Sequence, residues 1–368
     1  MGLILRVHTW SHRMHVLRNE LKNLLRRRDE WQSVTLTAEE KQAARAYMKK
    51  HYGRAVPTIW HRLYKSTTGH FDERYFPEIL FSMYLEEKLN PHLIAKPLSN
   101  KVFCPQQLFA DLPADSGIRV PRALLINANG MFWRDGAPVS REEAEACLGD
   151  AGEVIVKPSI DTMGARNVRL FRFEGGKDAL KGQSAAEVLA LYKSNFLVQE
   201  RIRCHASIAG LYGESVNTCR VITYLLGDKV HTGPISMRIG MGGRVVDNGS
   251  LEIGVEPDGS LHSRAYGKYH NTAYDAHPDT GVRFEGYRIG GVPAMTEAAR
   301  RLHGRLPQLG MISWDLTYDR EGRVVVIEVN TTGQSLGFTQ RIPGQPAFGE
   351  NTPAMYALIR KGPRGGTL

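Results

Sequence analysis

The chain has 368 residues, of which 42% are hydrophobic and 23% are charged, and its formal net charge at pH 7 is +10. This length predicts two or three packed lobes, and the charge favours an anionic partner: a nucleotide, a phosphorylated sugar, nucleic acid or an acidic membrane surface. The four cysteines show no CxxC spacing, which argues against a zinc site and a disulfide framework. No apolar run is long enough to cross a bilayer and the N-terminus is basic, so we expect a cytoplasmic protein.

The first ninety or so residues are predicted to be helical. An apolar stripe runs from Leu3 to Leu24 at alternating spacings of four and three residues, and the basic run Arg26–Arg28 follows it. This basic helix can pack on the body of the protein, pair with a second copy in a homodimer, or dock weakly on a membrane surface. Further helical patterns cover Ala38–Lys50 and Phe76–Leu89.

From about residue 100 the pattern changes to strands mixed with helices. Ser140, with Glu143 three residues later, predicts a capped helix over Ser140–Cys147. A larger antiparallel section follows, with turns at residues 227–228 and 257–259. The predicted strands are Ala123–Ile126, Glu153–Val156, Val168–Phe173, Phe196–Gln199, Thr218–Leu226, Ile235–Ile239 and Leu251–Val255, and the other predicted helices are Ala185–Lys193 and Met295–Leu306.

Lys157 ends an apolar strand, and a loop of small and polar residues, which includes Ser159 and Gly164, follows it. The backbone N–H groups of such a loop can surround phosphate oxygens while the ammonium pairs with them. The GxxxxGK[ST] order of a Walker loop is absent. A surface hairpin whose lysine protects a strand edge is the alternative. Lys101 is a weaker candidate, since most lysines are simply solvated.

Other polar residues interrupt or end apolar strands. The backbone of Gln199–Ile202 can bind an adenine edge, and Glu200 can accept a hydrogen bond from the amine or from a ribose hydroxyl, although a plain strand end fits equally well. Arg220 lies inside an apolar strand, so it faces either solvent or an anion such as phosphate or carboxylate. A looser polar set occupies the glycine-rich middle: Arg238, Asp247, Asn248, Lys268 and His277, the last more typical of a hydrogen-bonded group than of a ligand.

The segment Gly310–Thr331 resembles two apolar strands around a polar turn. If the turn at Asp319–Gly322 has an even length, Trp314 faces Ile327 and one face is wholly apolar, whereas an odd length breaks this match. Carboxylate and amide oxygens on the opposite face suit a hard cation such as Mg²⁺. A half-exposed hairpin with its acids in solvent is the alternative. The residues predicted to share that face are Asp315, Glu328 and Asn330.

Taken in this order, these motifs resemble the ATP-grasp superfamily, and most closely its sugar-transfer-associated family, which is similar to the alpha-L-glutamate ligases. The resemblance covers roughly residues 95–360. The segments that carry it are Ser215–Val221, Ser236–Gly240, Val246–Asn248, His277–Gly281, Ser313–Asp315 and Ile327–Asn330.

The resemblance implies an α+β ATP-grasp fold, in which two α+β lobes with antiparallel sheets grip ATP, preceded by a helical region. The implied divisions are 1–95 for the helical N-terminal region, 96–203 for the N-terminal lobe with its phosphate-binding lid, 204–361 for the C-terminal lobe with the metal site, and 362–368 for a tail.

The resemblance also implies roles for the candidate residues. Lys101 and Lys157 would contact the phosphates of ATP, and Arg220 would stabilise an acyl phosphate. The loop with Ser159 and Gly164 would close as a lid, although it has fewer glycines than is usual in the family. Gln199, Glu200 and Ile202 would hold adenine. The ligands of one or two Mg²⁺ (or Mn²⁺) ions would be Asp315, Glu328 and Asn330, and those of the substrate would be Arg238, Asp247, Asn248 and Lys268.

The function implied is an ATP-dependent carboxylate–amine ligase that forms an amide through an acyl phosphate, in cell-surface polysaccharide or natural-product biosynthesis. Its small-molecule partners would be a carboxylate and an amine, such as an amino sugar or an amino acid. A kinase that phosphorylates a sugar or polyol hydroxyl is the alternative. A basic motif interleaved with base-stacking aromatic residues is absent, which argues against nucleic acid.

Overall fold

The computed structural model describes residues 2–102, 106, 109, 111–160, 167–245, 251–268 and 270–360, with side chains from residue 14 onward except those of residues 270 and 271. Among these residues Cys147, Cys204 and Cys219 are free thiols, as expected. The predicted tail, the predicted ligands Asp247 and Asn248, and Gly164 lie outside the described residues.

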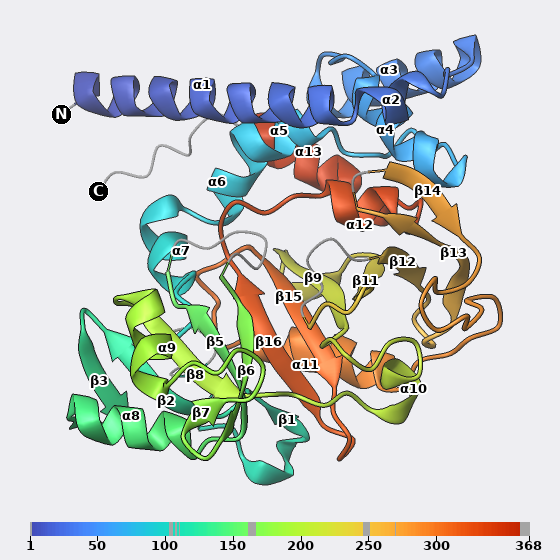
Figure 1. The fold of residues 1–368 in the computed structure, drawn as a ribbon. Coiled ribbons are helices and arrows are strands. Elements are labelled where there is room, and N and C mark those ends of the chain that lie inside the picture. The colour runs from blue at the N-terminus through green and yellow to red at the C-terminus, as the bar shows by residue number, and fades with distance from the viewer. Residues whose placement is uncertain are drawn as a thin grey trace.

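Helices were predicted for the first ninety or so residues, and the structure has a layer of helices that extends to Leu98 along one side of the molecule (Figure 1). Thr37 and Glu40 cap helix α3 reciprocally, which sets where it begins. The C-terminal half of the first helix packs on the body through Glu20 and Leu24, whereas Met14 and Leu21 are exposed. The helices are α1 (Gly2–Arg26), α2 (Arg28–Gln32), α3 (Ala38–Tyr52), α4 (Ile59–Thr68), α5 (Glu78–Leu80), the π-helix η1 (Phe81–Leu85), α6 (Glu86–Leu89) and α7 (His92–Leu98).

The smaller sheet is antiparallel and has the order β4-β3-β2-β8-β5-β6-β7. Helices α8 (Arg141–Gly149) and α9 (Ala185–Tyr192) bury Leu148 and Val188 against Val156 and Phe171. The Ser140–Glu143 capping box is confirmed. The strands are β2 (Ala123–Ala128), β3 (Met131–Arg134), β4 (Ala137–Val139), β5 (Glu153–Pro158), β6 (Arg169–Glu174), β7 (Lys177–Asp178) and β8 (Phe196–Glu200).

The larger sheet has the order β1-β16-β15-β9-β11-β12-β13-β14, with β10 paired to β9. All its pairs are antiparallel except β1 with β16. The strands are β1 (Ile118–Arg119), β9 (Thr218–Leu226), β10 (Lys229–Thr232), β11 (Ile235–Ile239), β12 (Leu251–Val255), β13 (Leu261–Gly267), β14 (His270–Tyr274), β15 (Met311–Tyr318) and β16 (Val324–Asn330).

Helices cover both faces of the larger sheet. Helix α11 (Val292–His303) packs on the face that holds Val221 and Trp314. On the other face, Ile222 and Tyr224 lie under α3 and α13 (Thr352–Arg360). This second face is apolar only at that end. The remaining short helices are η3 (Ala114–Ser116), α10 (Ala206–Ala209), α12 (Gly337–Arg341) and η4 (Gly349–Asn351).

The turn between β15 and β16 differs from the prediction. Tyr318 pairs with Val324, so the turn spans Asp319–Arg323, an odd number of residues, and the expected even turn is wrong. Trp314 consequently pairs with Val329 and not with Ile327. The carboxylate of Asp319 accepts hydrogen bonds from the backbone N–H groups of Glu321 and Arg323, which stabilises the longer turn.

A β-bulge compensates for the odd turn. Asp315 pairs with Glu328, whereas the next residue, Leu316, pairs with Val326, so Ile327 is the extra residue. Because side chains alternate along a strand, one extra residue reverses the face on which all later side chains lie. The bulge therefore places the three predicted metal ligands on a shared face. This face was predicted, but from an even turn and not from an odd turn with a bulge.

Candidate functional site

Three charged side chains lie side by side on neighbouring strands of the larger sheet. Asp315 on β15 is directly opposite Arg220 on β9 and directly opposite Glu328 on β16. Arg220 grips Asp315 with two nitrogens, Nε at 2.5 Å from Oδ1 and Nη2 at 2.9 Å from Oδ2. Burial alone would raise the pKa of Asp315, but Arg220 holds it below its ordinary value. Asp315 is therefore an ionised carboxylate.

Asn330 and Lys101 complete this row. The Asn330 amide donates to the carbonyl of Ser313 at 3.3 Å and to Oδ2 of Asp315 at 3.4 Å. The Nζ of Lys101 lies 3.3 Å from Oε1 of Glu328. Two carboxylates directly opposite each other repel, and these two cations offset that repulsion: Arg220 beside Asp315 and Lys101 beside Glu328. Lys101, which was predicted to bind phosphate, thus contacts Glu328, one of the predicted metal ligands.

Lys157 lies at the end of β5 and faces the same region from the smaller sheet. Burial is the main reason that the pKa of its ammonium is lowered to about 8, and the charge of Lys101 lowers it further, while Glu328 raises it. Both Lys101 and Glu328 are thus close enough to act on it electrostatically. Within the described residues, Lys157 forms no ion pair. Because an unpaired buried charge is costly, binding of an anion beside its ammonium would be favourable.

Backbone hydrogen bonds attach Lys101 to the end of the smaller sheet. The N–H of Lys101 donates to the carbonyl of Ser159 at 2.9 Å, and the N–H of Ser159 donates to the carbonyl of Asn195 at 2.8 Å. Ser159 is buried beside Lys157 at the start of the predicted lid. The structure therefore brings Lys101, Lys157 and Ser159 together, although Lys101 is far from the other two in sequence.

The segment Gln199–Ile202 leaves the smaller sheet and leads to the larger one. Gln199 is buried, and its Oε1 has no hydrogen-bond partner among the described residues. Because an orphaned buried acceptor is costly, this atom favours a donor from a bound molecule at this position. Ile202 is buried as well.

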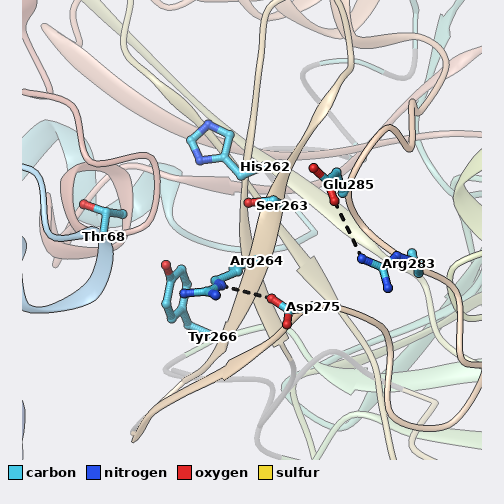
Figure 2. Close-up of a pocket in the computed structure, with 8 residues that line it drawn as sticks. All are labelled: Thr68, His262, Ser263, Arg264, Tyr266, Asp275, Arg283 and Glu285. Carbon is cyan, nitrogen blue, oxygen red and sulfur yellow. Dashed lines mark hydrogen bonds and ion pairs between the residues drawn. The ribbon is translucent and has the colours of Figure 1, made fainter.

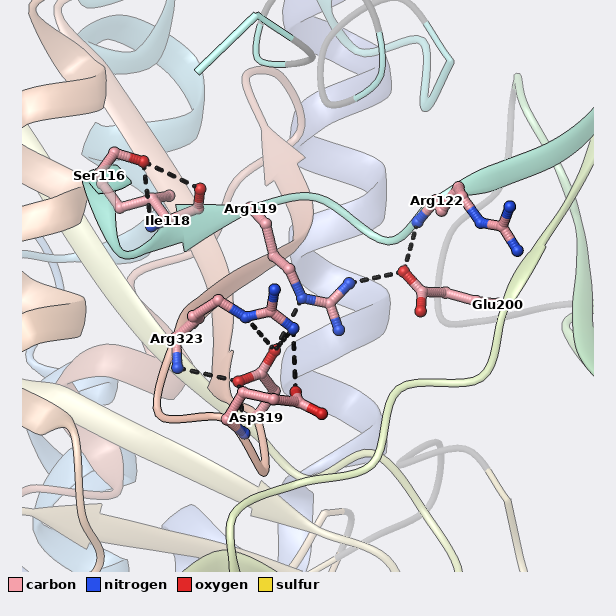
Figure 3. A network of polar contacts seen from close by, with 8 residues as sticks. Ser116, Ile118, Arg119, Arg122, Glu200, Asp319 and Arg323 are labelled. Carbon is pink, nitrogen blue, oxygen red and sulfur yellow. Dashed lines mark hydrogen bonds and ion pairs between the residues drawn. The ribbon is translucent and has the colours of Figure 1, made fainter. Parts of the chain in front are cut away.

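Glu200 already has partners in a network that joins the two sheets (Figure 3). Its Oε1 accepts from Nη1 of Arg119 at 2.6 Å and from the backbone N–H of Arg122 at 2.7 Å. Arg119 also donates to Oδ2 of Asp319 at 2.7 Å. Oε2 of Glu200 has no part in these hydrogen bonds, so one oxygen is available for the predicted ribose or adenine contact.

The predicted substrate residues are only partly described. Arg238 on β11 lies on the same face as Arg220 and stacks over the ring of Phe338, with its guanidinium carbon 4.5 Å from the ring centroid. Its Nε is buried without a hydrogen-bond partner among the described residues and lies 4.0 Å from Oε1 of Glu252. The Lys268 carbonyl accepts from Nη2 of Arg27 at 2.8 Å, so this residue contacts the N-terminal layer.

His277 is a hydrogen-bonded group, as the sequence favoured for a lone histidine. It is buried, its Nε2 is 2.7 Å from the carbonyl oxygen of Gly240, and its ring stacks on Tyr212.

Two groups of residues near the site were not predicted. The first is Arg119 with Asp319, whose contact joins residues 200 positions apart. The second is Asn90, whose side chain bonds both backbone groups of Met311 and the carbonyl of Thr331, at the two ends of the hairpin strands. No local pattern identifies such residues, because their partners lie on distant segments.

Asp315, Glu328 and Asn330 offer the types of oxygen that a magnesium ion prefers, and they lie on one face. Oδ1 of Asp315 accepts only from Arg220 and keeps a lone pair, whereas Oδ2 accepts from both Arg220 and the amide nitrogen of Asn330. Among the described residues, no group of three or more His, Cys, Asp and Glu side chains could hold a metal ion. The predicted set therefore depends on the amide oxygen of Asn330.

A pocket of about 540 Å³ lies elsewhere, on β13 and the loop after β14 (Figure 2). Its charged side chains pair with each other: Arg264 Nε is 2.9 Å from Asp275 Oδ1, and Arg283 Nη2 is 3.6 Å from Glu285 Oε2. Of the predicted site residues that the structure describes, none lines it. It is therefore separate from the site described above.

Comparisons with known proteins were made by sequence and by structure. No curated protein matched the sequence. Similar solved structures include D-alanyl-alanine synthetase A from Vibrio cholerae, with 15% identity and a TM-score of 0.41 over 73% of this chain and 67% of that chain. VanG D-Ala:D-Ser ligase from Enterococcus faecalis has 13% identity and a TM-score of 0.37 over 72% and 62%. The ATP-grasp ligase PsnB has 15% identity and a TM-score of 0.37 over 72% and 61%.

This chain therefore spans less than two thirds of the length of VanG and of PsnB, and identities this low say nothing about the reaction. The family comparison is stronger. The model of the sugar-transfer-associated ATP-grasp family matches residues 80–352, which is well over half of the chain. As predicted, the chain has the ATP-grasp fold and belongs to the sugar-transfer-associated ATP-grasp family.

Proposed function

We propose that this protein is an ATP-dependent carboxylate–amine ligase that forms an amide through an acyl phosphate. The observation that supports it most is that Lys101, Lys157 and Glu328 lie close together, although they come from the segment after α7, the smaller sheet and the larger sheet. Cations from two sides and a metal-ligating face from the third are what the transfer of a phosphoryl group needs.

In the proposed reaction, an oxygen of the carboxylate substrate attacks the γ-phosphorus of ATP, and ADP leaves. The amine nitrogen then attacks the acyl carbon, phosphate leaves, and the nitrogen loses a proton. Lys101 and Lys157 would stabilise the negative charge on the phosphoryl oxygens, and Arg220, held in place by Asp315, would stabilise the acyl phosphate. Mg²⁺ or Mn²⁺ held by Asp315, Glu328 and Asn330 would neutralise charge on the β- and γ-phosphates.

The remaining assignments concern ligand binding. The backbone of Gln199–Ile202, with Glu200, would hold adenine and ribose, while Ser159 and Gly164 would belong to the lid. Arg238, Asp247, Asn248 and Lys268 would bind the substrates. The sugar-transfer association of the family favours an amino sugar or amino acid as the amine, in polysaccharide or natural-product assembly. The division at residues 95, 203 and 361 is part of the same proposal.

Release of ADP from ATP tests this function when purified protein is given a panel of carboxylates and amines with Mg²⁺. We expect release that requires a carboxylate, and an amide in the mass spectrum of the product. ADP release without any carboxylate would contradict the proposal, and a stable phosphoester on a sugar hydroxyl would identify a kinase instead.

Glu328→Gln keeps the size of the side chain but removes its charge. We expect it to lower the turnover rate about 10²–10³-fold, the usual effect of removing one electrostatic group from an active site. Glu321→Gln is the matched control, because Glu321 lies in the turn of the same hairpin and is exposed. Equal activity of the two variants would remove Glu328 from the proposed site.

A further inference from the structure

In the part of helix α1 whose side chains the structure describes, residues 14–26, Glu20 and Leu24 hold the helix to the body. Glu20 and Leu24 are buried, and the indole N–H of Trp60 donates to Oε1 of Glu20 at 2.8 Å. The indole of Trp31 donates to the carbonyl of Leu24 at 2.9 Å. The helix has 25 residues, which corresponds to a length of about 37 Å, and its ribbon runs along the top edge of the molecule (Figure 1).

Part of the apolar stripe of α1 is exposed to solvent and forms an exposed row with Leu25. Met14, Leu21 and Leu25 are 47%, 51% and 67% exposed. Their spacings of seven and four residues place them on one side of the helix, next to the packed side. A helix whose apolar residues served only the core would not leave three large ones in a row outside it.

Positive charge borders this exposed row. Arg18 and Lys22 are exposed and lie one helical turn apart, beside Leu21 and Leu25. Residues 2–28 contain seven Lys and Arg but one acid, Glu20, so they carry 7 − 1 = +6 of the net charge of +10 of the whole chain. The one acid, Glu20, is buried against the body beside Trp60 and does not lie in the exposed row, and burial raises its pKa.

The exposed apolar row and its basic border distinguish between the two partners that the sequence left open for this helix, a second copy of the chain and a membrane surface. Two copies of a helix with the same strong positive charge repel each other, so charge does not favour a second copy of the chain. No helix among the described residues is long and apolar enough to span a bilayer. An exposed apolar row with a basic border is instead the pattern of helices that lie in the interface of a membrane with anionic lipids.

We propose that α1 docks this protein on an anionic lipid surface, with Met14, Leu21 and Leu25 inserted among the acyl chains and Arg18 and Lys22 against the headgroups. This docking is independent of the ligase reaction, since none of the five residues belongs to the proposed site.

Flotation of the full-length protein with lipid vesicles tests the proposal. We expect it to float with phosphatidylcholine vesicles that contain phosphatidylserine, and to remain unbound with pure phosphatidylcholine. Arg18→Gln with Lys22→Gln should weaken binding roughly 25-fold, since each basic residue near an anionic surface contributes roughly fivefold. Leu21→Ser with Leu25→Ser should weaken it by at least about tenfold, through loss of insertion.

Control variants on the smaller lobe change two basic residues and two leucines away from α1. They are Lys177→Gln with Lys181→Gln, and Leu180→Ser with Leu191→Ser, all of which are exposed positions. Both controls should bind the anionic vesicles like the unchanged protein, and all four variants should keep the unfolding midpoint within a few degrees.

Three results would overturn the proposal. One is equal binding to neutral and anionic vesicles, and another is equal weakening by the control variants. The third is a dimer in sedimentation without lipid that Leu21→Ser with Leu25→Ser dissociates, since a second copy would then be the occupant of the exposed row.

Discussion

The two sheets supply charge to the site in different ways. The larger sheet presents charges already matched, since Arg220, Asp315 and Glu328 are direct neighbours across three strands. The smaller sheet presents a single buried ammonium, Lys157, which forms no ion pair with the described part of the chain. Matched charges hold their geometry before any ligand arrives, whereas an unmatched buried charge is costly until an anion joins it.

The difference between a paired and an unpaired buried charge affects the pKa values of Asp315 and Lys157. Arg220 keeps the pKa of Asp315 low in spite of burial, whereas burial lowers the pKa of Lys157 to about 8. Asp315 thus has a charged partner within the protein, whereas Lys157 has none among the described residues, and five experiments can test that difference.

The largest effect is expected for Arg220→Met. It leaves the Asp315 carboxylate buried without its main cation, so the free energy of unfolding should fall by about 3–5 kcal/mol. Urea unfolding measures this change. The double variant with Asp315→Asn should recover most of the loss, because the uncompensated charge is then gone. Purely additive losses in the two single variants would show that the charges are not matched as described.

Lys157→Met should reduce ligand affinity and not stability, in contrast to Arg220→Met. Removing an unpaired buried charge should leave the free energy of unfolding unchanged or higher. Affinity for Mg·ATP should nevertheless fall by about 100-fold, the upper range for a hydrogen bond to a charged group. Calorimetric titration with ATP and urea unfolding give the two quantities. A large loss of stability would mean that Lys157 belongs to the fold and not to the ligand.

Glu78 extends the comparison to a buried carboxylate without a strong cation partner. It accepts from the N–H of Leu336 at 3.1 Å, and burial raises its pKa to about 8. The unfolded carboxyl ionises near pH 4.5, so the native state holds the extra proton between these values and stability must fall as pH rises across them.

Glu78→Gln should therefore make the fall in unfolding free energy between about pH 5 and pH 8 smaller by about 3–4 kcal/mol. Urea unfolding at both pH values measures it, and Glu285→Gln is the exposed control. Some pH dependence should remain, because burial also raises the pKa of Glu86, to about 7. An unchanged pH profile would mean that Glu78 is ionised in the folded protein.

The titration of Lys157 predicts a pH dependence of ATP binding. Above about pH 8 the free protein increasingly holds the neutral amine, so binding of the anion requires uptake of a proton. The affinity should then decrease by up to about tenfold per pH unit. Lys157→Arg should flatten this decrease, because a guanidinium stays protonated. A parallel decrease in that variant would assign the titration to another group.

The smallest effect is expected for Arg119→Gln at the junction of the sheets. Asp319 retains hydrogen bonds from Arg323, and Glu200 retains the backbone N–H of Arg122, so neither carboxylate is left without a partner. The free energy of unfolding should fall by only about 1 kcal/mol. Arg122→Gln should change nothing, since only its backbone takes part. A loss as large as that of Arg220→Met would make the junction a main source of stability.

Much of the fold follows from local patterns in the sequence. The bounds of β9, β11 and β12 and the capping box of Ser140 with Glu143 agree with prediction, because alternation and capping act between residues close in sequence. Strands such as β13 and β14 were missed. Their polar residues, with Arg264 exposed, do not alternate clearly with apolar ones.

The hairpin of β15 and β16 shows the limit of such patterns. The shared face of Asp315, Glu328 and Asn330 was predicted from an even turn, yet the structure reaches it through an odd turn and a bulge at Ile327. The alternation of side chains predicts only whether two residues share a face. The extra residue in the turn and the extra residue in the bulge cancel each other, so the shared face is kept.

The sequence by itself determined the family, many of the strand patterns and the candidate residues for binding phosphate and metal. Only the tertiary structure decided which of them meet: that Lys101 reaches Glu328, that Arg220 grips Asp315 and that Arg119 joins the two sheets. The physical reason is that periodicity reports short-range backbone geometry, whereas a charge chooses its partner by distance in space, which depends on how distant segments pack.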